Sequence, residues 1–277
     1  MKIIPLLDFE ANLNPVNFEE EAKILNLNYC FKHIFDIEEL NKYQDIIITD
    51  KAALNNIQNF INKNIYLWIM EPPVVNSCIY EFAKKNNKKF KKIFSHNKKF
   101  CSEIENAFWY PWGSYFIPLN EHFLYEKNKN TSIVCSSKSW TEGHKFRHQC
   151  FEKIKHLLDG YKYGDPVEPK IKWHKEYRFS IAVENCVEKG YFTEKILDCF
   201  RTGTIPIYKG DPEILNYFNK DGILLFNELE ELEEIVKKAD EKFYQERINA
   251  VNENFIKAQP YLFPWKYIKE NYLNEIL

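Results

Sequence analysis

The feature that most constrains this chain is the alternation of short apolar runs with longer stretches of helical periodicity. The short runs are rich in β-branched and aromatic residues, and they predict strands at 2–7, 45–49, 65–70, 92–95, 132–136, 178–183, 204–208 and 223–226. The longer stretches predict helices at 17–25, 51–60, 74–85, 142–158, 194–202, 212–218 and 228–255. This order is typical of α/β units built around parallel sheets, so we expect an α/β fold.

The chain is long enough for two such units. Its apolar periodicity is lost between residues 119 and 131, so we place the boundary there, with domains at 1–125 and 126–277. Two similar α/β halves that face each other would form a cleft at the carboxyl ends of their strands, where sheets of this kind bind ligands.

Composition excludes several classes of protein. The 277 residues are 45% hydrophobic and 28% charged, which is typical of a globular protein rather than a disordered one. The net charge is −2, so we expect no binding to nucleic acid. The seven cysteines are scattered and form no C-x-x-C pair, and the chain lacks an apolar stretch of about 20 residues. We therefore expect a cytoplasmic protein.

Familiar nucleotide and hydrolase signatures are absent. The sequence contains no G-x-G-x-x-G, G-x-x-x-x-G-K-[ST], G-x-S-x-G or H-E-x-x-H motif. It also lacks a D-x-D pair, which could share a divalent cation with a diphosphate. His144 and His148 have the spacing of two metal ligands on one helix, but no third ligand is evident. We expect no metal and no cofactor, so that protein cations would replace a metal in any nucleotide site.

The most informative segment spans residues 178–211, RFSIAVENCVEKGYFTEKILDCFRTGTIPIYKGD. Its strand delivers Glu184 and Asn185 to a carboxyl end, and Thr193 is a suitable N-cap for the helix that follows. Lys195 and the free N–H groups of that helix could hold a diphosphate. Glu194 could accept hydrogen bonds from both hydroxyls of a ribose. The alternative is that Glu194 only interacts with the helix dipole and Lys195 is solvated.

The order E-N-x(5)-Y-x-T-E-K, followed by I-P-I-Y-x-G-D-P, resembles the signature of glycosyltransferase family 10, the α1,3/α1,4-fucosyltransferases, in its bacterial form. The resemblance is dense from residue 132 to about residue 219. Upstream it is thinner, but Glu71-Pro72-Pro73 and the run I-F-S-H-N at 93–97 are similar to family landmarks. Cys186 and Lys209 depart from the family pattern, which leaves the transferred sugar less certain than the nucleotide chemistry.

This resemblance implies a GT-B fold, with two Rossmann-like domains facing a central cleft. The donor, GDP-β-L-fucose, would bind the second domain through Arg147, Glu184, Asn185, Tyr191, Thr193, Glu194 and Lys195. Arg147 and Lys195 would clamp the diphosphate, Glu194 would bind the ribose and Tyr191 would line the pocket. Glu184 and Asn185 would lie near the sugar or the pyrophosphate. Alternatively, Glu184 and Asn185 form a strand-end turn and Tyr191 belongs to the core.

The candidate catalytic base is Glu71. It follows the expected strand at 65–70 and precedes two prolines, so it should lie at a strand's carboxyl end. An inverting transfer requires a carboxylate to take the proton of the acceptor hydroxyl. The alternative is an exposed glutamate in a proline-rich turn.

The acceptor implied is an oligosaccharide or glycolipid of lipopolysaccharide or capsule type, joined in α1,3 linkage. Trp109, Trp112 and Tyr115 are candidates for stacking on its sugars, with core or interface packing as the alternative. Residues 260–277 predict one aromatic helix that packs back on the first domain or, alternatively, makes a peripheral contact with the inner face of the membrane. A different nucleotide sugar, or a non-catalytic glycan- or nucleotide-binding role, remains the alternative function.

Overall fold

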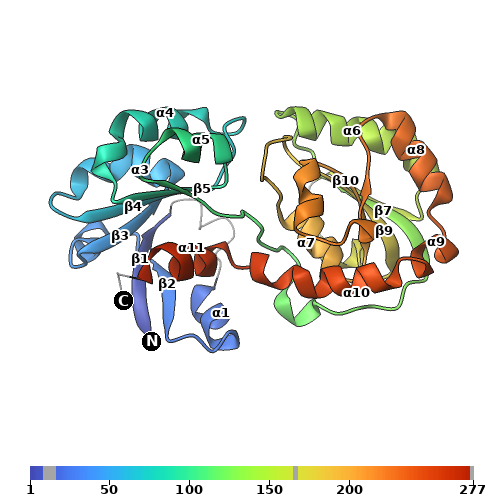
Figure 1. The fold of residues 1–277 in the computed structure, drawn as a ribbon, viewed down its shortest axis with the longest axis horizontal. Helices are drawn as coiled ribbons and strands as arrows, with labels where there is room; N and C mark the ends of the chain where they lie inside the picture. The colour runs from blue at the N-terminus through green and yellow to red at the C-terminus, as the bar shows by residue number, and fades with distance from the viewer. Residues whose placement is uncertain (9–16, 165–167, 275–277) are drawn as a thin grey trace. The chain divides into compact units, whose positions relative to one another are not determined.

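The computed structural model describes residues 1–8, 17–164 and 168–274. The chain divides into two compact units (Figure 1). Unit 1 comprises Met1–Tyr110 together with Trp265–Leu277, and unit 2 comprises Pro111–Pro264. The sequence placed the boundary after residue 125 and had the last helix of the second domain pack back on the first. In the structure the chain leaves unit 1 after Tyr110 and returns to it at Trp265, in that last helix.

Unit 1 is built on a six-stranded parallel sheet in the order β2-β1-β3-β4-β5-β6. Its strands are β1 (Lys2–Leu7), β2 (Tyr29–His33), β3 (Asp45–Thr49), β4 (Asn64–Ile69), β5 (Lys92–Ser95) and β6 (Ala107–Trp109). The strands β3 and β4 are almost entirely buried. Buried parallel strands read as continuous apolar runs, which is why these two were predictable from the sequence.

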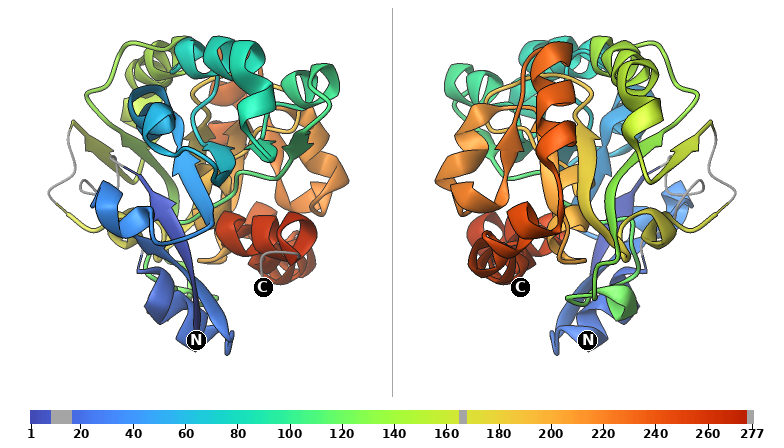
Figure 2. Two further views of the ribbon diagram at one scale, coloured as in Figure 1. Left: turned by 90° about the vertical axis from the view of Figure 1, so that its left-hand side faces the viewer. Right: turned by 90° about the vertical axis from the view of Figure 1, so that its right-hand side faces the viewer.

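Helices cover both faces of this sheet (Figures 1 and 2). They are α1 (Phe18–Ile24), α2 (Ile37–Leu40), α3 (Asp50–Asn56), α4 (Ser77–Asn86), α5 (Lys98–Glu103) and α11 (Pro264–Tyr272). The apolar sides of α3 and α4 pack on one face. On the other face, the indole of Trp265 in α11 packs against the rings of Phe18, Tyr29 and Phe31. The last helix therefore completes the core of unit 1.

Unit 2 contains a five-stranded parallel sheet in the order β11-β10-β9-β7-β8. Its strands are β7 (Lys129–Cys135), β8 (Gly160–Tyr163), β9 (Tyr177–Val183), β10 (Ile205–Lys209) and β11 (Leu224–Leu225). Its helices are α6 (Glu142–Ile154), α7 (Glu194–Phe200), α8 (Leu229–Lys238), α9 (Glu241–Gln245) and α10 (Ile248–Lys257). Helix α6 packs beside α8, and α7 packs beside α10 (Figure 1).

Short 3₁₀ helices extend or connect these elements. They are η1 (Ile57–Asn59), η2 (Asn87–Lys89), η3 (Leu119–Glu121), η4 (Lys155–Leu157), η5 (Lys170–Trp173), η6 (Pro212–Asn216), η7 (Lys220–Gly222) and η8 (Gln259–Tyr261). In the described ranges, no helix is long and apolar enough to cross a bilayer.

The structure confirms the α/β class and corrects several elements. Strands β2, β6 and β8 were not predicted. The single long helix expected at 228–255 is wrong, because the chain divides there into α8, α9 and α10. The break follows from a new cap: the Asp240 side chain accepts a hydrogen bond from the backbone N of Phe243 at 2.7 Å and starts α9.

Candidate functional site

The carboxyl ends of two neighbouring strands of unit 2 meet where the strand order reverses. The chain passes from β7 to β8 on one side, and then to β9 on the other side of β7. Open α/β sheets bind ligands at such a reversal, outside the carboxyl ends of the strands. Strand β7 ends at Cys135 and β9 at Val183, with Glu184 and Asn185 directly after it. The candidate site is formed by these residues and by the helices α6 and α7.

Helix α6 approaches the end of β9 closely because residue 143 is glycine. A Cβ atom at Gly143 would lie 2.0 Å from the backbone oxygen of Glu184. The Gly143 N–H donates to the backbone oxygen of Asn185 at 3.2 Å. One turn later, Nη2 of Arg147 donates to the backbone oxygen of Val183 and, at 3.4 Å, to Oδ1 of Asn185. Arg147 is 7% exposed, so its guanidinium is fixed at the end of β9.

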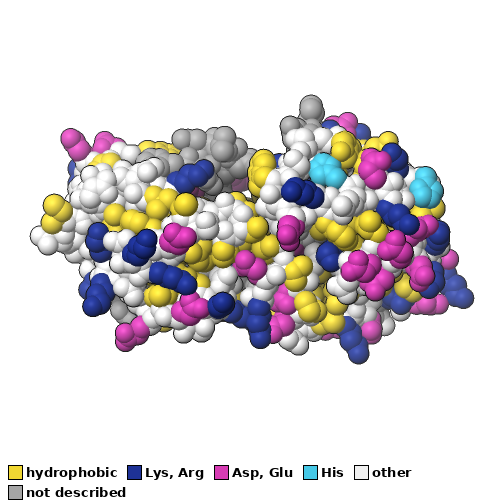
Figure 3. Space-filling view, turned by 90° about the horizontal axis from the view of Figure 1, so that it is seen from above, with side chains coloured by type: hydrophobic (Ala, Val, Ile, Leu, Met, Phe, Trp, Pro, Cys, Tyr) yellow, Lys and Arg dark blue, Asp and Glu magenta, His cyan; other side chains and the backbone are white. Residues whose placement is uncertain are grey.

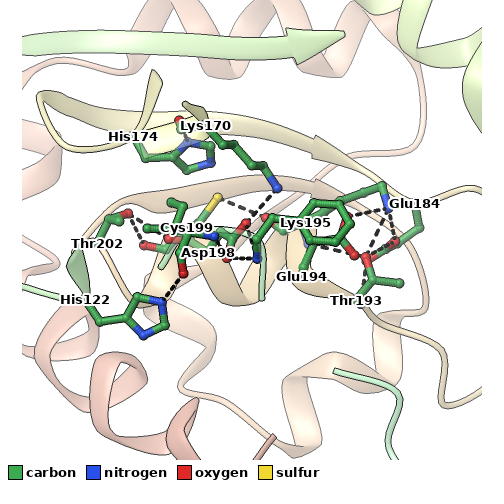
Figure 4. Close-up of polar contacts among 12 residues, drawn as sticks. His122, Lys170, His174, Glu184, Thr193, Glu194, Lys195, Asp198, Cys199 and Thr202 are labelled. Atoms are coloured by element: carbon green, nitrogen blue, oxygen red, sulfur yellow. Dashed lines mark hydrogen bonds and ion pairs between the residues drawn. The ribbon is translucent and has the colours of Figure 1, made fainter. Parts of the chain in front are cut away.

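Helix α7 begins with Thr193, Glu194 and Lys195, whose polar groups bond to one another and to Glu184 (Figure 4). Glu184 is 2% exposed, and its carboxylate accepts from the Thr193 N–H at 2.9 Å and from the Thr193 hydroxyl at 2.8 Å. The Lys195 ammonium lies 3.5 Å from Oε2 of Glu184 and 3.2 Å from Oε1 of Glu194. A carboxylate from β9 thus orders the first turn of α7.

Glu194 is held as a carboxylate although it is buried. Burial opposes its ionisation, but the ammonium groups of Lys195 and Lys170, with hydrogen bonds from Lys195 and Thr193, lower the pKa of Glu194 to about 2. An ionised carboxylate can accept two hydrogen bonds from vicinal hydroxyls, as a ribose offers them. The sequence-derived assignment of Glu194 to a ribose is therefore chemically consistent with its surroundings.

Two residues that the sequence did not identify extend this charged cluster. Asp198 is fully buried one turn after Glu194, and its Oδ2 lies 2.8 Å from the ammonium of Lys170 (Figure 4). Oδ1 of Asp198 also accepts from the backbone N–H of Phe116 at 3.1 Å. Burial lowers the pKa of Lys170, but attraction to Asp198 and Glu194 outweighs this effect and raises it, so Lys170 stays charged. Asp198 has one local signal in the sequence, its four-residue spacing from Glu194 on the helix expected at 194–202, but nothing local indicates its pairing with Lys170.

The cluster brings together most of the predicted donor-binding residues. Arg147, Glu184, Asn185, Thr193, Glu194 and Lys195 lie on the adjoining ends of β9, α6 and α7. Tyr191 lies between Asn185 and Thr193 in the chain, in a turn closed by its N–H to the oxygen of Glu188 at 3.0 Å, and it is 2% exposed. Cations beside an ionised carboxylate are suited to a ligand that carries both a phosphate and a diol.

The predicted base, Glu71, belongs to unit 1. It is half-buried and follows β4 at the carboxyl end of the sheet, as expected. Its backbone oxygen accepts a hydrogen bond from the Tyr80 hydroxyl at 3.0 Å.

The three predicted acceptor aromatics are divided between the units. Trp109 ends β6 in unit 1, where its Nε1 donates to the His96 oxygen at 3.0 Å and the Lys98 ammonium lies 5.0 Å from its ring centroid. Trp112 and Tyr115 belong to unit 2. The Tyr115 ring packs against His122 at 5.6 Å and Phe263 at 5.8 Å between ring centroids. Trp109 and Tyr115 thus each have packing partners within their own unit.

The two histidines with metal-ligand spacing have separate partners. Nδ1 of His144 interacts with the Thr141 backbone N–H in the cap of α6, whereas Nδ1 of His148 lies 2.9 Å from the Tyr163 hydroxyl. Across the described ranges, no group of three or more His, Cys, Asp or Glu residues could hold a metal ion. Charged side chains of both signs are interspersed over the face of unit 2 that Figure 3 shows.

Comparison with known proteins confirms the resemblance seen in the sequence. Residues 125–246 match the family model described as glycosyltransferase family 10 (fucosyltransferase), C-terminal. A segment of 73 residues, 26% of this chain, is 33% identical to the α-(1,3)-fucosyltransferase FucT of Helicobacter pylori, but it covers only 15% of that relative. A mouse 3-α-L-fucosyltransferase is 27% identical over 141 residues, which are 47% of this chain and 39% of the relative.

Solved structures confirm the GT-B fold. A crystal structure of an α1,3-fucosyltransferase superposes with a TM-score of 0.61, over 98% of this chain and 91% of that chain, at 14% identity. Anabaena HepE in complex with UDP and glucose superposes with a TM-score of 0.65, over 100% of this chain and 99% of that chain, at 12% identity. At such low identity these likenesses establish the fold alone.

Proposed function

We propose that this chain, in which residues 125–246 form a family 10 glycosyltransferase domain, transfers L-fucose from GDP-β-L-fucose to a hydroxyl of a glycan acceptor. The observation that carries the proposal is the convergence of Arg147, Lys195 and the ionised Glu194 where the sheet order of unit 2 reverses. A nucleotide diphosphate needs cations for its phosphates and an acceptor of hydrogen bonds for its ribose.

Each donor-site residue has a proposed role. Lys195 and Arg147 neutralise the diphosphate, and Glu194 accepts from the ribose hydroxyls. Glu184 orders Thr193 and Lys195, as its hydrogen bonds to Thr193 suggest. Asn185 is assigned to the pyrophosphate or sugar and Tyr191 to the wall of the pocket.

In the proposed reaction, Glu71 removes the proton of the acceptor hydroxyl while that oxygen attacks C1 of fucose. The bond from C1 to the diphosphate breaks with inversion of configuration, and the electron pair leaves with GDP. Arg147 and Lys195 stabilise the charge that develops on the leaving diphosphate. We propose that these cations serve without a divalent metal, since the sequence lacks D-x-D.

A second candidate keeps the same chemistry but changes the donor. The similar structure of HepE is described with UDP and glucose, whereas another similar structure is an α1,3-fucosyltransferase with GDP-fucose, so the fold accommodates both nucleotides. Because Cys186 and Lys209 depart from the family pattern, donors that carry a sugar other than fucose should also be tested. A non-catalytic glycan- or nucleotide-binding protein is the third candidate.

The acceptor we propose is an oligosaccharide or glycolipid of lipopolysaccharide or capsule type, modified in α1,3 linkage in the cytoplasm. Trp109, Trp112 and Tyr115 remain proposed acceptor contacts. Contact with the inner face of the membrane would present a lipid-linked acceptor.

A donor screen tests the proposal. The purified chain would be incubated with GDP-fucose, GDP-mannose, UDP-glucose and UDP-galactose together with mixed glycan acceptors, and released nucleotide would be measured. We expect acceptor-dependent release from GDP-fucose. Release from a UDP-sugar alone would favour the second candidate, and no release from any donor would favour the third.

A further inference from the structure

The backbone of residues 69–71, which carries Glu71, is hydrogen-bonded by side chains from three other elements of unit 1. The Ile69 oxygen accepts from the Tyr110 hydroxyl at 2.9 Å. The Met70 N–H donates to Oδ2 of Asp50 at 3.0 Å. The Glu71 oxygen accepts from the Tyr80 hydroxyl at 3.0 Å. Three consecutive residues are thus each fixed by a different side chain.

These side chains are deeply buried. Tyr110 is 0% exposed, Asp50 2% and Tyr80 6%. Tyr110 directly follows β6, Asp50 begins α3 and Tyr80 lies in the first turn of α4. A buried polar group weakens a core unless it is hydrogen-bonded.

His96 adds a fourth buried side chain at the same strand end. It is 0% exposed and follows β5, the neighbour of β4 in the sheet. Burial lowers the pKa of His96 to about 4, and its ring packs edge-on against that of Tyr110, with 6.4 Å between the ring centroids. The ring is therefore neutral near pH 7 and adds no charge beside Glu71.

Residues of the I-F-S-H-N run at 93–97 also form hydrogen bonds around this strand end. Oγ of Ser95 lies 3.4 Å from the Tyr80 hydroxyl and accepts from the backbone N–H of Asn97 at 3.2 Å. The His96 oxygen accepts from Nε1 of Trp109 at 3.0 Å. The run at 93–97 and the Glu71-Pro72-Pro73 landmark are far apart in the sequence but form one cluster in unit 1.

The backbone of Glu71 is restricted from its other side as well. Pro72 follows it directly and disfavours a helical conformation at Glu71. The Pro72 oxygen then accepts from the N–H groups of Val75 at 2.9 Å and Asn76 at 3.0 Å, which closes the next turn. Glu71 therefore lies between a hydrogen-bonded strand end and a rigid turn.

We propose that Asp50, Tyr80 and Tyr110 are positioning residues that hold the Glu71 carboxylate in place for proton transfer. The inference rests on the proposed role of Glu71 as base. A misplaced base loses rate although substrate still binds, because the reacting atoms no longer meet in the required geometry. These residues should therefore govern kcat and leave donor affinity unchanged.

The test uses isosteric variants that remove one hydroxyl each. Tyr80→Phe and Tyr110→Phe would be compared with Glu71→Gln and with the control Tyr66→Phe. Tyr66 is also a buried residue, but its hydroxyl donates to Oδ1 of Asp45, at the amino ends of β4 and β3, at 3.2 Å. For each full-length variant, kcat, KM for GDP-fucose, GDP affinity and Tm would be measured.

We expect Tyr80→Phe and Tyr110→Phe each to lower kcat about 10-fold, the effect of one lost hydrogen bond on a positioned group. KM for GDP-fucose and GDP affinity should stay within about twofold of wild type, because the donor residues lie in unit 2. Tyr66→Phe should keep kcat within about twofold of wild type, even if it lowers Tm as much as Tyr80→Phe and Tyr110→Phe do.

Other results would distinguish the role of Glu71 as base from the role of the surrounding side chains in positioning it. Wild-type kcat in both Phe variants, with an inactive Glu71→Gln, would overturn the positioning role but leave the base in place. Full activity of Glu71→Gln would remove the base and the positioning role together. If the wild-type chain turned over no donor, crystal structures of the Phe variants would decide: an unmoved Glu71 carboxylate would overturn the positioning role.

Discussion

Lys195 shares its ammonium group between two carboxylates, with 3.5 Å to Glu184 and 3.2 Å to Glu194. Its side chain is 17% exposed, so a phosphate can approach it from solvent. Arg147 differs, since its guanidinium is tied to the ends of β9 through Val183 and Asn185. Of the two cations in the proposed clamp, Lys195 thus pairs with two carboxylates, whereas Arg147 donates to uncharged oxygens at the end of β9.

Lys195→Ala and Arg147→Ala should each weaken GDP binding by about 1.5 to 3 kcal/mol, as expected for hydrogen bonds to charged groups. Both variants should also lower Tm: Arg147→Ala leaves the Val183 oxygen without this donor, and Lys195→Ala leaves the buried carboxylates of Glu184 and Glu194 without this cation. Calorimetric titration and thermal unfolding measure both effects. The control is Lys189→Ala, whose side chain is 70% exposed and paired with Glu213. Unchanged GDP affinity in both site variants would remove the clamp.

The pKa of Glu194 gives a prediction about pH. Since the folded state lowers that pKa from 4.5 to about 2, ionised Glu194 contributes stability above pH 4.5 that is lost as the pH falls toward 2. Glu194→Gln cannot make this contribution. The difference in free energy of unfolding between wild type and Glu194→Gln should therefore shrink below pH 4.5, as urea titrations at several pH values would show. A constant difference down to the lowest measurable pH would contradict the assignment.

At the level of residues, the sequence predicted the part of the candidate site whose residues lie close together in the chain. Glu184, Thr193, Glu194 and Lys195 follow one strand and begin one helix, so strand and cap signals suffice to bring them together. Lys170 and Asp198 were missed because their ion pair joins two elements that no local pattern relates. The hydrogen bonds of Asp50 and Tyr110 to residues 69–71 were also missed, because they too join elements that no local pattern relates.

At the level of elements, the approach of α6 to β9 decides where Arg147 lies. Helix α6 begins with a capping box at Thr141, and Gly143 in its first turn meets the backbone after β9. Helix α7 has only seven residues, fewer than the sequence suggested, so we assign phosphate binding to side-chain cations rather than to its dipole.

Gly143→Ala should weaken GDP binding at least about 10-fold, because misplacing a binding group by even 1 Å is costly. The added Cβ would lie 2.0 Å from the Glu184 oxygen and 2.6 Å from the Asn185 carbonyl carbon, so α6 must shift with Arg147. Gln149→Ala, at an exposed position of the same helix, is the control and should bind GDP as wild type does. A Gly143→Ala variant with normal GDP affinity would show that the close approach has no role in the site.

Other elements were harder to predict. The edge strand β8 has partly exposed residues and no continuous apolar run, and β6 has three residues, so neither gives a clear periodic signal. The helical pattern after residue 228 continues through the break at Asp240, where a local cap interrupts it. Tertiary packing and capping, rather than periodicity, set these boundaries.

At the level of the whole molecule, the chain builds unit 1 from both of its ends. Trp265 is 2% exposed, and its Nε1 donates to Oε2 of Glu21 at 2.6 Å. Trp265→Ala should lower the free energy of unfolding by about 3 to 5 kcal/mol, the usual cost of removing a buried aromatic side chain. GDP affinity should stay within about twofold, since the proposed donor-binding residues lie in unit 2. Urea unfolding and GDP titration measure both, and loss of GDP binding in a folded variant would contradict the assignment of the site to unit 2 alone.

The central claim is that unit 2 binds GDP through protein cations and a ribose-binding carboxylate. Titration calorimetry of the purified chain with GDP, UDP and CMP, each with and without EDTA, tests it most directly. We expect GDP to bind at least about 10-fold more tightly than UDP or CMP and with the same affinity in EDTA. Preference for UDP or CMP, loss of GDP binding in EDTA, or no binding of any nucleotide would contradict the account.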